Sequence, residues 1–248
     1  QIRGEASTLP FFSNGQFVNP MVLRVPGLGY QKGFGGHFHN DNSLTIFRDI
    51  PGLVLAIPSN GADAVRMLRT AVKEAYKNGR IIVFIEPIAL YMTKDLHKAK
   101  DGKWEFIYPD LNDESLIGEF KSYGNGRLLT ILTYGNGLYL SLQAQKDIEK
   151  KLGKKIKIID LMWISDVNYE TLLKEISPCK SILIVDECRR SGCHGEGILA
   201  NLILKSKKPL NIALHAAEDS FISIGNAATA TLPSKDSIVQ NALNLVNA

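Results

Sequence analysis

Residues 27–43, GLGYQKGFGGHFHNDNS, are the stretch whose residue types best suit chemistry. Its glycines, at positions 27, 29, 33, 35 and 36, open backbone conformations that other residues rarely adopt. The stretch also contains His37 and His39, followed by three polar residues. Histidine exchanges protons near neutral pH and also binds metals, and a loop this long inside a compact domain is usually functional or disordered. Residues 27–43 are therefore the first candidate site.

Three interpretations of these histidines compete. A metal site would use His37, His39 and Asp41, which point to one side if the segment is extended, because side chains alternate along a strand. A structural zinc site takes four ligands, however, and no fourth is evident nearby. The second interpretation is a solvated loop with incidental histidines. The favoured interpretation is an active-site loop that brings a histidine to a bound ligand.

Two other stretches lie where ligands often bind. Residues 133–137, TYGNG, follow an expected strand and open an expected helix, a position that can cradle phosphate. A single G-x-G without a third glycine nevertheless favours an ordinary strand-to-helix turn. Residues 186–192, DECRRSG, follow another expected strand, at the edge where open α/β sheets bind ligands. Cys188 and Cys193 have the wrong spacing for zinc and Cys179 is remote, so no metal is predicted.

The elements that must position these residues begin with three short apolar runs at 21–25, 53–57 and 81–85. Each is bounded by Pro or Gly and rich in β-branched residues, which predicts buried strands of a parallel sheet. Residues 62–76 repeat apolar positions at helical spacing, so they form the helix between the last two strands. Residues 93–126 are polar and predict a connection between domains.

A second alternation follows this connection. Strands are expected at 128–133, 156–161, 181–185 and 210–214, and helices at 138–152, 169–176, 195–204 and 237–246. Strands that alternate with helices predict a doubly wound α/β sheet. This half is complete, whereas the first half offers few strands and one crossover helix. We therefore expect the chain to begin partway through its first domain.

Composition excludes several classes of protein. The 248 residues carry a net charge of +4 from 29 basic and 25 acidic residues, which are scattered and not clustered as in nucleic-acid binding. No apolar run approaches the roughly 18 residues of a membrane span. Three cysteines do not suit a secreted disulfide framework. A reducing compartment is expected, either the cytoplasm or, in a eukaryote, the mitochondrial matrix.

Taken in order, these segments resemble a known family over the whole chain, the β subunit of the decarboxylating component of 2-oxo acid dehydrogenase complexes, in the transketolase-like superfamily. The resemblance rests on many short matches in register, none of them decisive alone. They are PMVLR at 20–24, the glycine loop ending at His39, PGL at 51–53, AIPS at 56–59, DA at 63–64, IEP at 85–87, LY at 90–91, TYG at 133–135, IDL at 159–161, VDE at 185–187 and the tail FISIGNAATATLPSKDSIV at 221–239.

This resemblance implies a fold and a set of partners. Residues 1–110 would be a truncated transketolase-like pyrimidine-binding domain and residues 118–248 a transketolase C-terminal-like domain. The family uses thiamine diphosphate and Mg²⁺, held mainly by a partner, either an α subunit or the N-terminal half of a fused chain. It also implies docking on a dihydrolipoamide acyltransferase core and a homo-oligomer, with no nucleic acid or membrane as partner.

The resemblance also implies an activity and one catalytic residue. The reaction is oxidative decarboxylation of a 2-oxo acid, such as pyruvate or a branched-chain acid, with acyl transfer to lipoamide, and the chain alone should be inactive. His39 matches the family's loop histidine, which faces the thiazolium ring. Asn40 and Leu44 replace a common Ser and Glu, which bears on acyl transfer more than on decarboxylation. Two alternatives are another transketolase-like thiamine enzyme and a docking module without chemistry.

Overall fold

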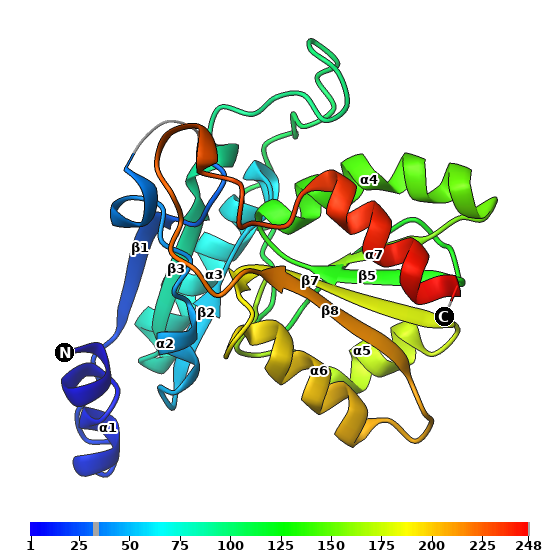
Figure 1. Ribbon diagram of the computed structural model, residues 1–248. Coiled ribbons are helices and arrows are strands. Elements are labelled where there is room, and N and C mark those ends of the chain that lie inside the picture. Colours follow the sequence, from blue (N-terminus) through cyan, green and yellow to red (C-terminus); the bar gives the residue numbers. More distant parts are fainter. Residues whose placement is uncertain (32–34, 248) are drawn as a thin grey trace.

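The computed structural model describes residues 1–31 and 35–247. They form two α/β halves, each built on its own sheet (Figure 1). A short π-helical segment, Ile2–Ala6, and helix α1 (Leu9–Phe12) precede the first sheet. The expected α/β fold class is confirmed.

The first sheet has three parallel strands, β1 (Met21–Gly27), β2 (Leu53–Ala56) and β3 (Ile81–Pro87), in the order β1-β3-β2. Helix α3 (Gly61–Asn78) is the crossover between β2 and β3. It begins because the Asn60 side chain accepts a hydrogen bond from the Asp63 N–H, and it ends at Gly79, whose φ of 65° suits glycine. All three strands and this helix agree with the expectation from sequence.

The second sheet has five strands in the order β4-β6-β5-β7-β8. Its members are β4 (Lys121–Tyr123), β5 (Leu129–Thr133), β6 (Lys157–Asp160), β7 (Ser181–Arg189) and β8 (Asn211–Ala217). Helices α4 (Asn136–Leu152) and α7 (Lys235–Asn247) cover one face, and α5 (Tyr169–Ile176) and α6 (His194–Lys205) cover the other (Figure 1). The doubly wound arrangement is therefore confirmed.

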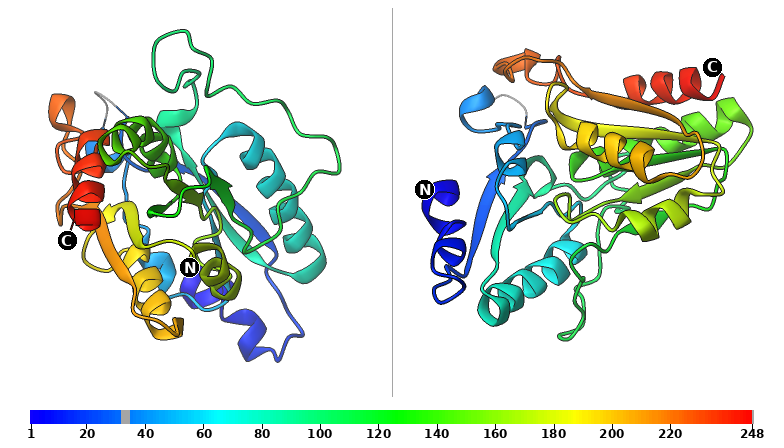
Figure 2. Two further views of the ribbon diagram at one scale, coloured as in Figure 1. Left: turned by 90° about the vertical axis from the view of Figure 1, so that its right-hand side faces the viewer. Right: turned by 90° about the horizontal axis from the view of Figure 1, so that it is seen from below.

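One expectation about residues 93–126 was wrong. They are not connection throughout, because β4 lies within them and pairs antiparallel with β6 at the edge of the second sheet. A strand of three residues carries too little alternation to be recognised. The rest of the segment, after a short helical turn at Ile88–Leu90, wraps around the outer side of α3 (Figure 2), where the side chain of Lys73 pairs with Glu114 at 2.6 Å.

The two sheets pack into one continuous apolar core. Leu55 and Ile57 of the first half lie in the same buried cluster as Leu132 and Leu161 of the second. The free edge of β2 is also covered by residues 162–164, since the Ile57 N–H donates to Met162 O at 2.8 Å and the Ile164 N–H donates to Leu55 O at 3.0 Å. Each half therefore stabilises the other.

Candidate functional site

The glycine-rich loop leaves β1, and its described residues, 27–31 and 35–43, pack against the carboxyl edge of the second sheet. In that sheet β6 lies on one side of β5 and β7 on the other, so the strand order reverses at β5. Open α/β sheets bind ligands at such a reversal. Here the chain's own loop lies there. The Gly29 N–H donates to Glu187 Oε2 at 3.3 Å, and Asn42 Nδ2 donates to the Glu187 carbonyl oxygen at 2.8 Å.

Glu187 is the group that holds this junction together. Its side chain also accepts hydrogen bonds from the Asn136 N–H at 3.2 Å and from Asn136 Nδ2 at 2.9 Å. Burial raises the pKa of Glu187 to about 8, against the opposing effect of the Asn136 hydrogen bonds and with a further increase from the nearby Asp186 charge. The carboxyl group is consequently protonated over much of the neutral range.

The structure thus brings together the two further stretches singled out from the sequence. The turn at 133–137 and the strand end at 186–192 meet through Asn136 and Glu187. Because the Asn136 N–H donates to Glu187, the turn does not present it to a phosphate. The neighbouring Asp186 carboxylate is likewise satisfied, by Tyr134 OH at 2.5 Å and by the Gly195 N–H at 2.7 Å. An ordinary strand-to-helix turn remains the better interpretation.

The two loop histidines differ in their surroundings. Residues Gly36–Phe38 form one 3₁₀ turn, so the segment is not extended and the common orientation of His37 and His39 expected for an extended segment does not arise. The His37 ring packs against Phe38 and Phe221, with ring centroids 4.1 Å and 4.8 Å away. The backbone N–H of His37 donates to Ile222 O at 3.1 Å. His37 is therefore a docking residue of the loop.

His39 is exposed and follows the turn directly. Its ring lies over Gly35, where an added Cβ would sit 2.1 Å from His39 Cδ2. Gly35 also has a φ of 71°, a conformation that favours glycine. The absence of a side chain at position 35 therefore sets the position of the His39 imidazole. Gly33, another of the five glycines, lies outside the described residues.

A metal centre at the loop has no support from the geometry. Within residues 1–31 and 35–247 no three His, Cys, Asp or Glu side chains gather as a metal site. Asp41 instead accepts a hydrogen bond from Ser43 Oγ at 2.9 Å and pairs with Arg189 at 3.1 Å. The Arg189 guanidinium also lies 5.3 Å from the Phe221 ring centroid. The Arg189–Asp41 pair is thus a second contact, after Gly29–Glu187, that holds the loop against the second sheet.

Neither the Gly29–Glu187 contact nor the Asp41–Arg189 contact was predicted from the sequence. Residues 186–192 were singled out as a strand end, without partners for Glu187 or Arg189. These contacts join residues about 150 positions apart, as 158 positions separate Gly29 from Glu187. Phe221 and Gly35 were also passed over as determinants of the two histidine positions. The five glycines near the histidines were the available indication that a ring packs directly on backbone.

The fold and the docked loop define an α/β protein of two sheets, and comparison with known proteins identifies the type of its second half. Residues 118–230 match the family Transketolase, C-terminal domain. The chain is 26% identical over 251 residues to the pyruvate dehydrogenase E1 component subunit beta of Staphylococcus epidermidis, covering 98% of this chain and 70% of that protein. It is 25% identical over 250 residues to the same subunit of Staphylococcus aureus, covering 97% and 70%.

A solved structure shows the same fold. It is a "Split gene transketolase, inactive beta4 tetramer", with a TM-score of 0.63 and 18% identity, covering 90% of this chain. The chain spans 66% of that structure's length, just under two thirds. The resemblance stated from the sequence is confirmed as a similarity: residues 118–230 match the transketolase C-terminal domain, and nearly the whole chain is similar to pyruvate dehydrogenase E1 beta subunits. In the part of the chain that the structure describes, none of the helices is both long and apolar enough to cross a membrane.

Proposed function

We propose that this chain is the β-type portion of the thiamine-diphosphate-dependent decarboxylating component of a 2-oxo acid dehydrogenase. It acts with an α subunit or with the N-terminal half of a fused chain, and it is inactive alone. The observation that carries this proposal is the exposed His39 imidazole on a glycine loop clamped at the strand-order reversal of the second sheet. The similarity to pyruvate dehydrogenase E1 beta subunits supports it.

The described residues suit the ring of this cofactor and not its diphosphate. Thiamine diphosphate, when bound, supplies a ring that stabilises a carbanion, while the protein orients it and excludes water. The exposed His39 ring, resting on Gly35, offers a proton-exchanging group to a ligand above the loop. In the strand-to-helix turn at 133–137 the Asn136 N–H already donates to Glu187, so this turn does not offer it to a phosphate. We therefore assign the diphosphate and Mg²⁺ to the partner.

In this proposal His39 is the proton carrier of the reaction. Its imidazole accepts or returns a proton at a ring nitrogen during decarboxylation and during acyl transfer to lipoamide. The loop backbone fixes where the ring stands, through the Gly29–Glu187 and His37–Ile222 hydrogen bonds. Pyruvate or a branched-chain 2-oxo acid is the proposed substrate. His39 is the one residue of this chain that we assign to catalysis.

Reassembly of the enzyme tests the proposal. The chain is mixed with its partner subunit, thiamine diphosphate and Mg²⁺, and reduction of an artificial electron acceptor is followed with pyruvate or 3-methyl-2-oxobutanoate. The complete mixture should turn over, whereas the chain alone and the partner alone should not. Tight, Mg²⁺-dependent binding of thiamine diphosphate to the isolated chain in calorimetry, or turnover by it, would contradict the proposal.

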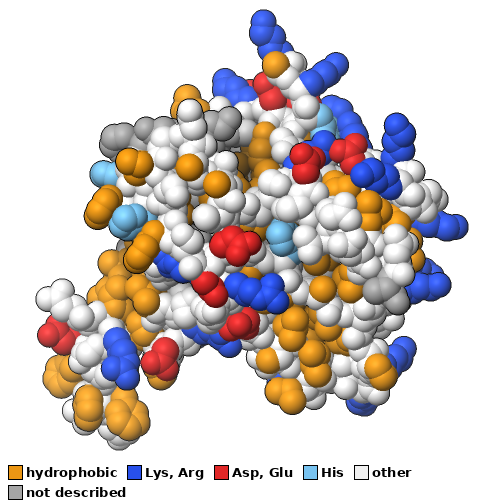
Figure 3. All heavy atoms as spheres, viewed as in Figure 1, with side chains coloured by type: hydrophobic (Ala, Val, Ile, Leu, Met, Phe, Trp, Pro, Cys, Tyr) orange, Lys and Arg blue, Asp and Glu red, His pale blue; other side chains and the backbone are white. Residues whose placement is uncertain are grey.

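We also propose protein partners and a domain boundary. The N-terminal segment exposes Phe11 and Phe12 by 82% and 80%, and hydrophobic side chains gather there on the surface (Figure 3). Exposed apolar clusters mark contact surfaces, which supports assembly with an α subunit, an acyltransferase core or a second copy.

We place the boundary between residues 1–110 and 118–248. The three cysteines are free, which supports a reducing compartment, cytoplasm or matrix.

A further inference from the structure

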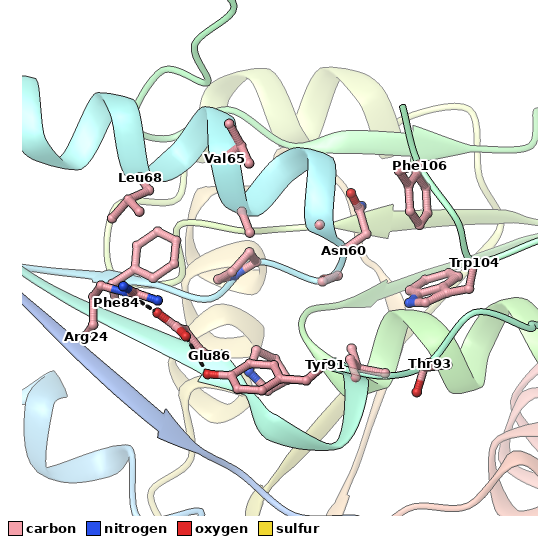
Figure 4. A pocket seen from close by; sticks show the side chains of 16 residues that line it. Arg24, Asn60, Val65, Leu68, Phe84, Glu86, Tyr91, Thr93, Trp104 and Phe106 are labelled. Carbon is pink, nitrogen blue, oxygen red and sulfur yellow. Dashed lines mark hydrogen bonds and ion pairs between the residues drawn. The ribbon is translucent and has the colours of Figure 1, made fainter. Parts of the chain in front are cut away.

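A pocket of about 590 Å³ lies at the carboxyl edge of the first sheet, away from the glycine loop. It is bounded by the ends of β1 and β3, the start of α3 and the connection that follows β3 (Figure 4). None of the described residues of the loop at 28–43 lines it. Pockets of this size typically hold small organic ligands, so this one is a candidate for a second ligand site.

The walls of the pocket are mainly apolar. Val65 and Leu68 of α3 face it from one side, Phe84 of β3 lies below, and Trp104 and Phe106 of the connection close the far end (Figure 4). Trp104 itself is held firmly, since its ring packs edge-on against Phe106 and Tyr139 at centroid distances of 5.3 Å and 5.0 Å. This is a preformed apolar cavity for a flat or branched body.

One end of the pocket carries an unused cationic donor. Arg24 Nε donates to Glu86 Oε1 at 2.5 Å, and Glu86 Oε2 accepts from Tyr91 OH. Both oxygens of Glu86 are thus occupied. The Nη groups of Arg24 meet no hydrogen-bond acceptor among the described residues, and water reaches them because the side chain is 61% exposed. Arg24 and Glu86 are the two charged residues of the described pocket lining, so an acceptor placed at Arg24 Nη meets a pair that is neutral overall.

The other end carries an unused neutral donor. Trp104 is only 6% exposed, yet its indole N–H has no acceptor within residues 1–31 and 35–247. The close-up shows the indole nitrogen turned toward the pocket (Figure 4). Buried tryptophan N–H groups usually find a partner, as Trp163 does by donating to Ser115 Oγ at 3.3 Å. The Trp104 nitrogen is not among the fully buried unpartnered atoms, so it opens on the pocket and can donate to an acceptor bound there.

We propose that this pocket binds a small organic acid with an aromatic or branched apolar body. Its carboxylate accepts hydrogen bonds from Arg24 Nη, its body lies against Leu68 and Phe84, and a second acceptor at its far end meets the Trp104 N–H. Apolar walls with unmatched donors at both ends select an apolar ligand that carries acceptors at both ends. The site is separate from His39 and does not depend on the function proposed above.

Calorimetric titration of the full chain with matched probes tests this proposal. The probes are 3-(4-methoxyphenyl)propionate, the corresponding alcohol 3-(4-methoxyphenyl)propan-1-ol, and 3-phenylpropionate, which lacks the far acceptor. The methoxy acid should bind at least about tenfold more tightly than the alcohol, because a charge-assisted hydrogen bond is lost. It should bind about threefold more tightly than 3-phenylpropionate, because a neutral one is lost.

Four variants and one control variant locate the binding. Arg24→Met should bring the acid and the alcohol to within about twofold of each other, whereas Arg127→Met, at an exposed arginine of the second half, should change nothing. Trp104→Phe should remove the preference for the methoxy group. Leu68→Trp should fill the pocket and abolish binding. If the thermal unfolding midpoint of the Leu68→Trp protein is lower than that of the unmodified chain, Val65→Phe is used in its place to fill the pocket. Equal binding of the acid and the alcohol by the unmodified chain would overturn the proposal and indicate that the pocket binds an apolar side chain of a partner protein. No binding at millimolar concentration, or binding that survives in a folded Leu68→Trp protein, would also overturn it.

Discussion

The Gly29 backbone N–H donates to Glu187 Oε2 at 3.3 Å, which joins the glycine loop of the first half to the buried end of β7 in the second. The position of the loop therefore depends on a sheet that lies far along the chain. Leu28, beside Gly29, is fully buried at a φ of 69°, an unusual conformation for leucine. The contacts that bury Leu28 and hold Gly29 keep this segment in place.

Replacement of Glu187 tests this junction. Glu187→Ala leaves the Asn136 N–H, Asn136 Nδ2 and Gly29 N–H without their acceptor, so the free energy of unfolding should fall by about 3 kcal/mol. Glu187→Gln keeps one acceptor oxygen but turns its NH2 toward the Gly29 or the Asn136 N–H, so it should cost less than Ala, about 1–2 kcal/mol. Urea unfolding of both variants measures this, with the exposed Glu170→Ala as control. A loss below about 0.5 kcal/mol for Glu187→Ala would show that the carboxyl group does not hold the loop.

Stability should fall as pH rises from about 6.5 to 8. Burial raises the pKa of Asp160 and of Glu187 to about 8 from ordinary values of 3.8 and 4.5. The folded state therefore keeps two protons that the unfolded state has already lost, and their contribution to stability disappears as pH approaches 8. Each group gives a slope of up to about 1.4 kcal/mol per pH unit.

The lower limit of this window comes from His194. Burial lowers the pKa of His194 to about 4 from an ordinary value of 6.5. Between these two values the unfolded state binds the additional proton, so His194 makes stability rise with pH there and opposes the two carboxyl groups. Urea unfolding at several pH values measures the slope. Asp160→Asn and Glu187→Gln should each remove about half of it. A slope unchanged in both variants would show that neither carboxyl retains its proton when folded.

Gly35→Ala should displace the His39 ring. The added Cβ would lie 2.1 Å from His39 Cδ2 at a φ of 71°. In the reassembled enzyme turnover should fall about as far as in a variant without His39, roughly 10²-fold or more. Gly225→Ala is the matched control, because Gly225 has a similar φ of 65° but open space around it. A similar loss of turnover in both variants would indicate backbone strain and not the ring.

Limited proteolysis should nick the chain without separating its halves. Lys98, Lys100 and Lys103 are exposed in the connection after β3, so brief trypsin treatment should cut there first. The fragments should elute together in gel filtration, since Leu55 and Ile57 share a core with Leu161 and since Ile57 pairs with Met162. They should separate in urea. Separation without denaturant would contradict the shared core.

Much of the fold follows from local sequence, and much of the site does not. Tyr169–Ile176 was predicted to the residue because apolar positions repeat at helical spacing within it. β4 was missed because three residues show no periodicity. The site depends on contacts between distant segments, such as Gly29 with Glu187 and His37 with Phe221, and local patterns carry no information about such pairs. His39 was chosen by resemblance, and its role remains a prediction.

Turnover of His39→Ala tests the central claim most directly. The variant is reassembled with its partner, thiamine diphosphate and Mg²⁺, and assayed with an artificial acceptor and then with lipoamide. Because a positioned proton carrier contributes about 10²–10⁴-fold to rate, turnover should fall by that factor. The free energy of unfolding should change by less than about 0.5 kcal/mol, because the side chain is exposed. His37→Ala, which loses only loop packing, should retain much more activity. Full activity of His39→Ala in both assays would contradict the account.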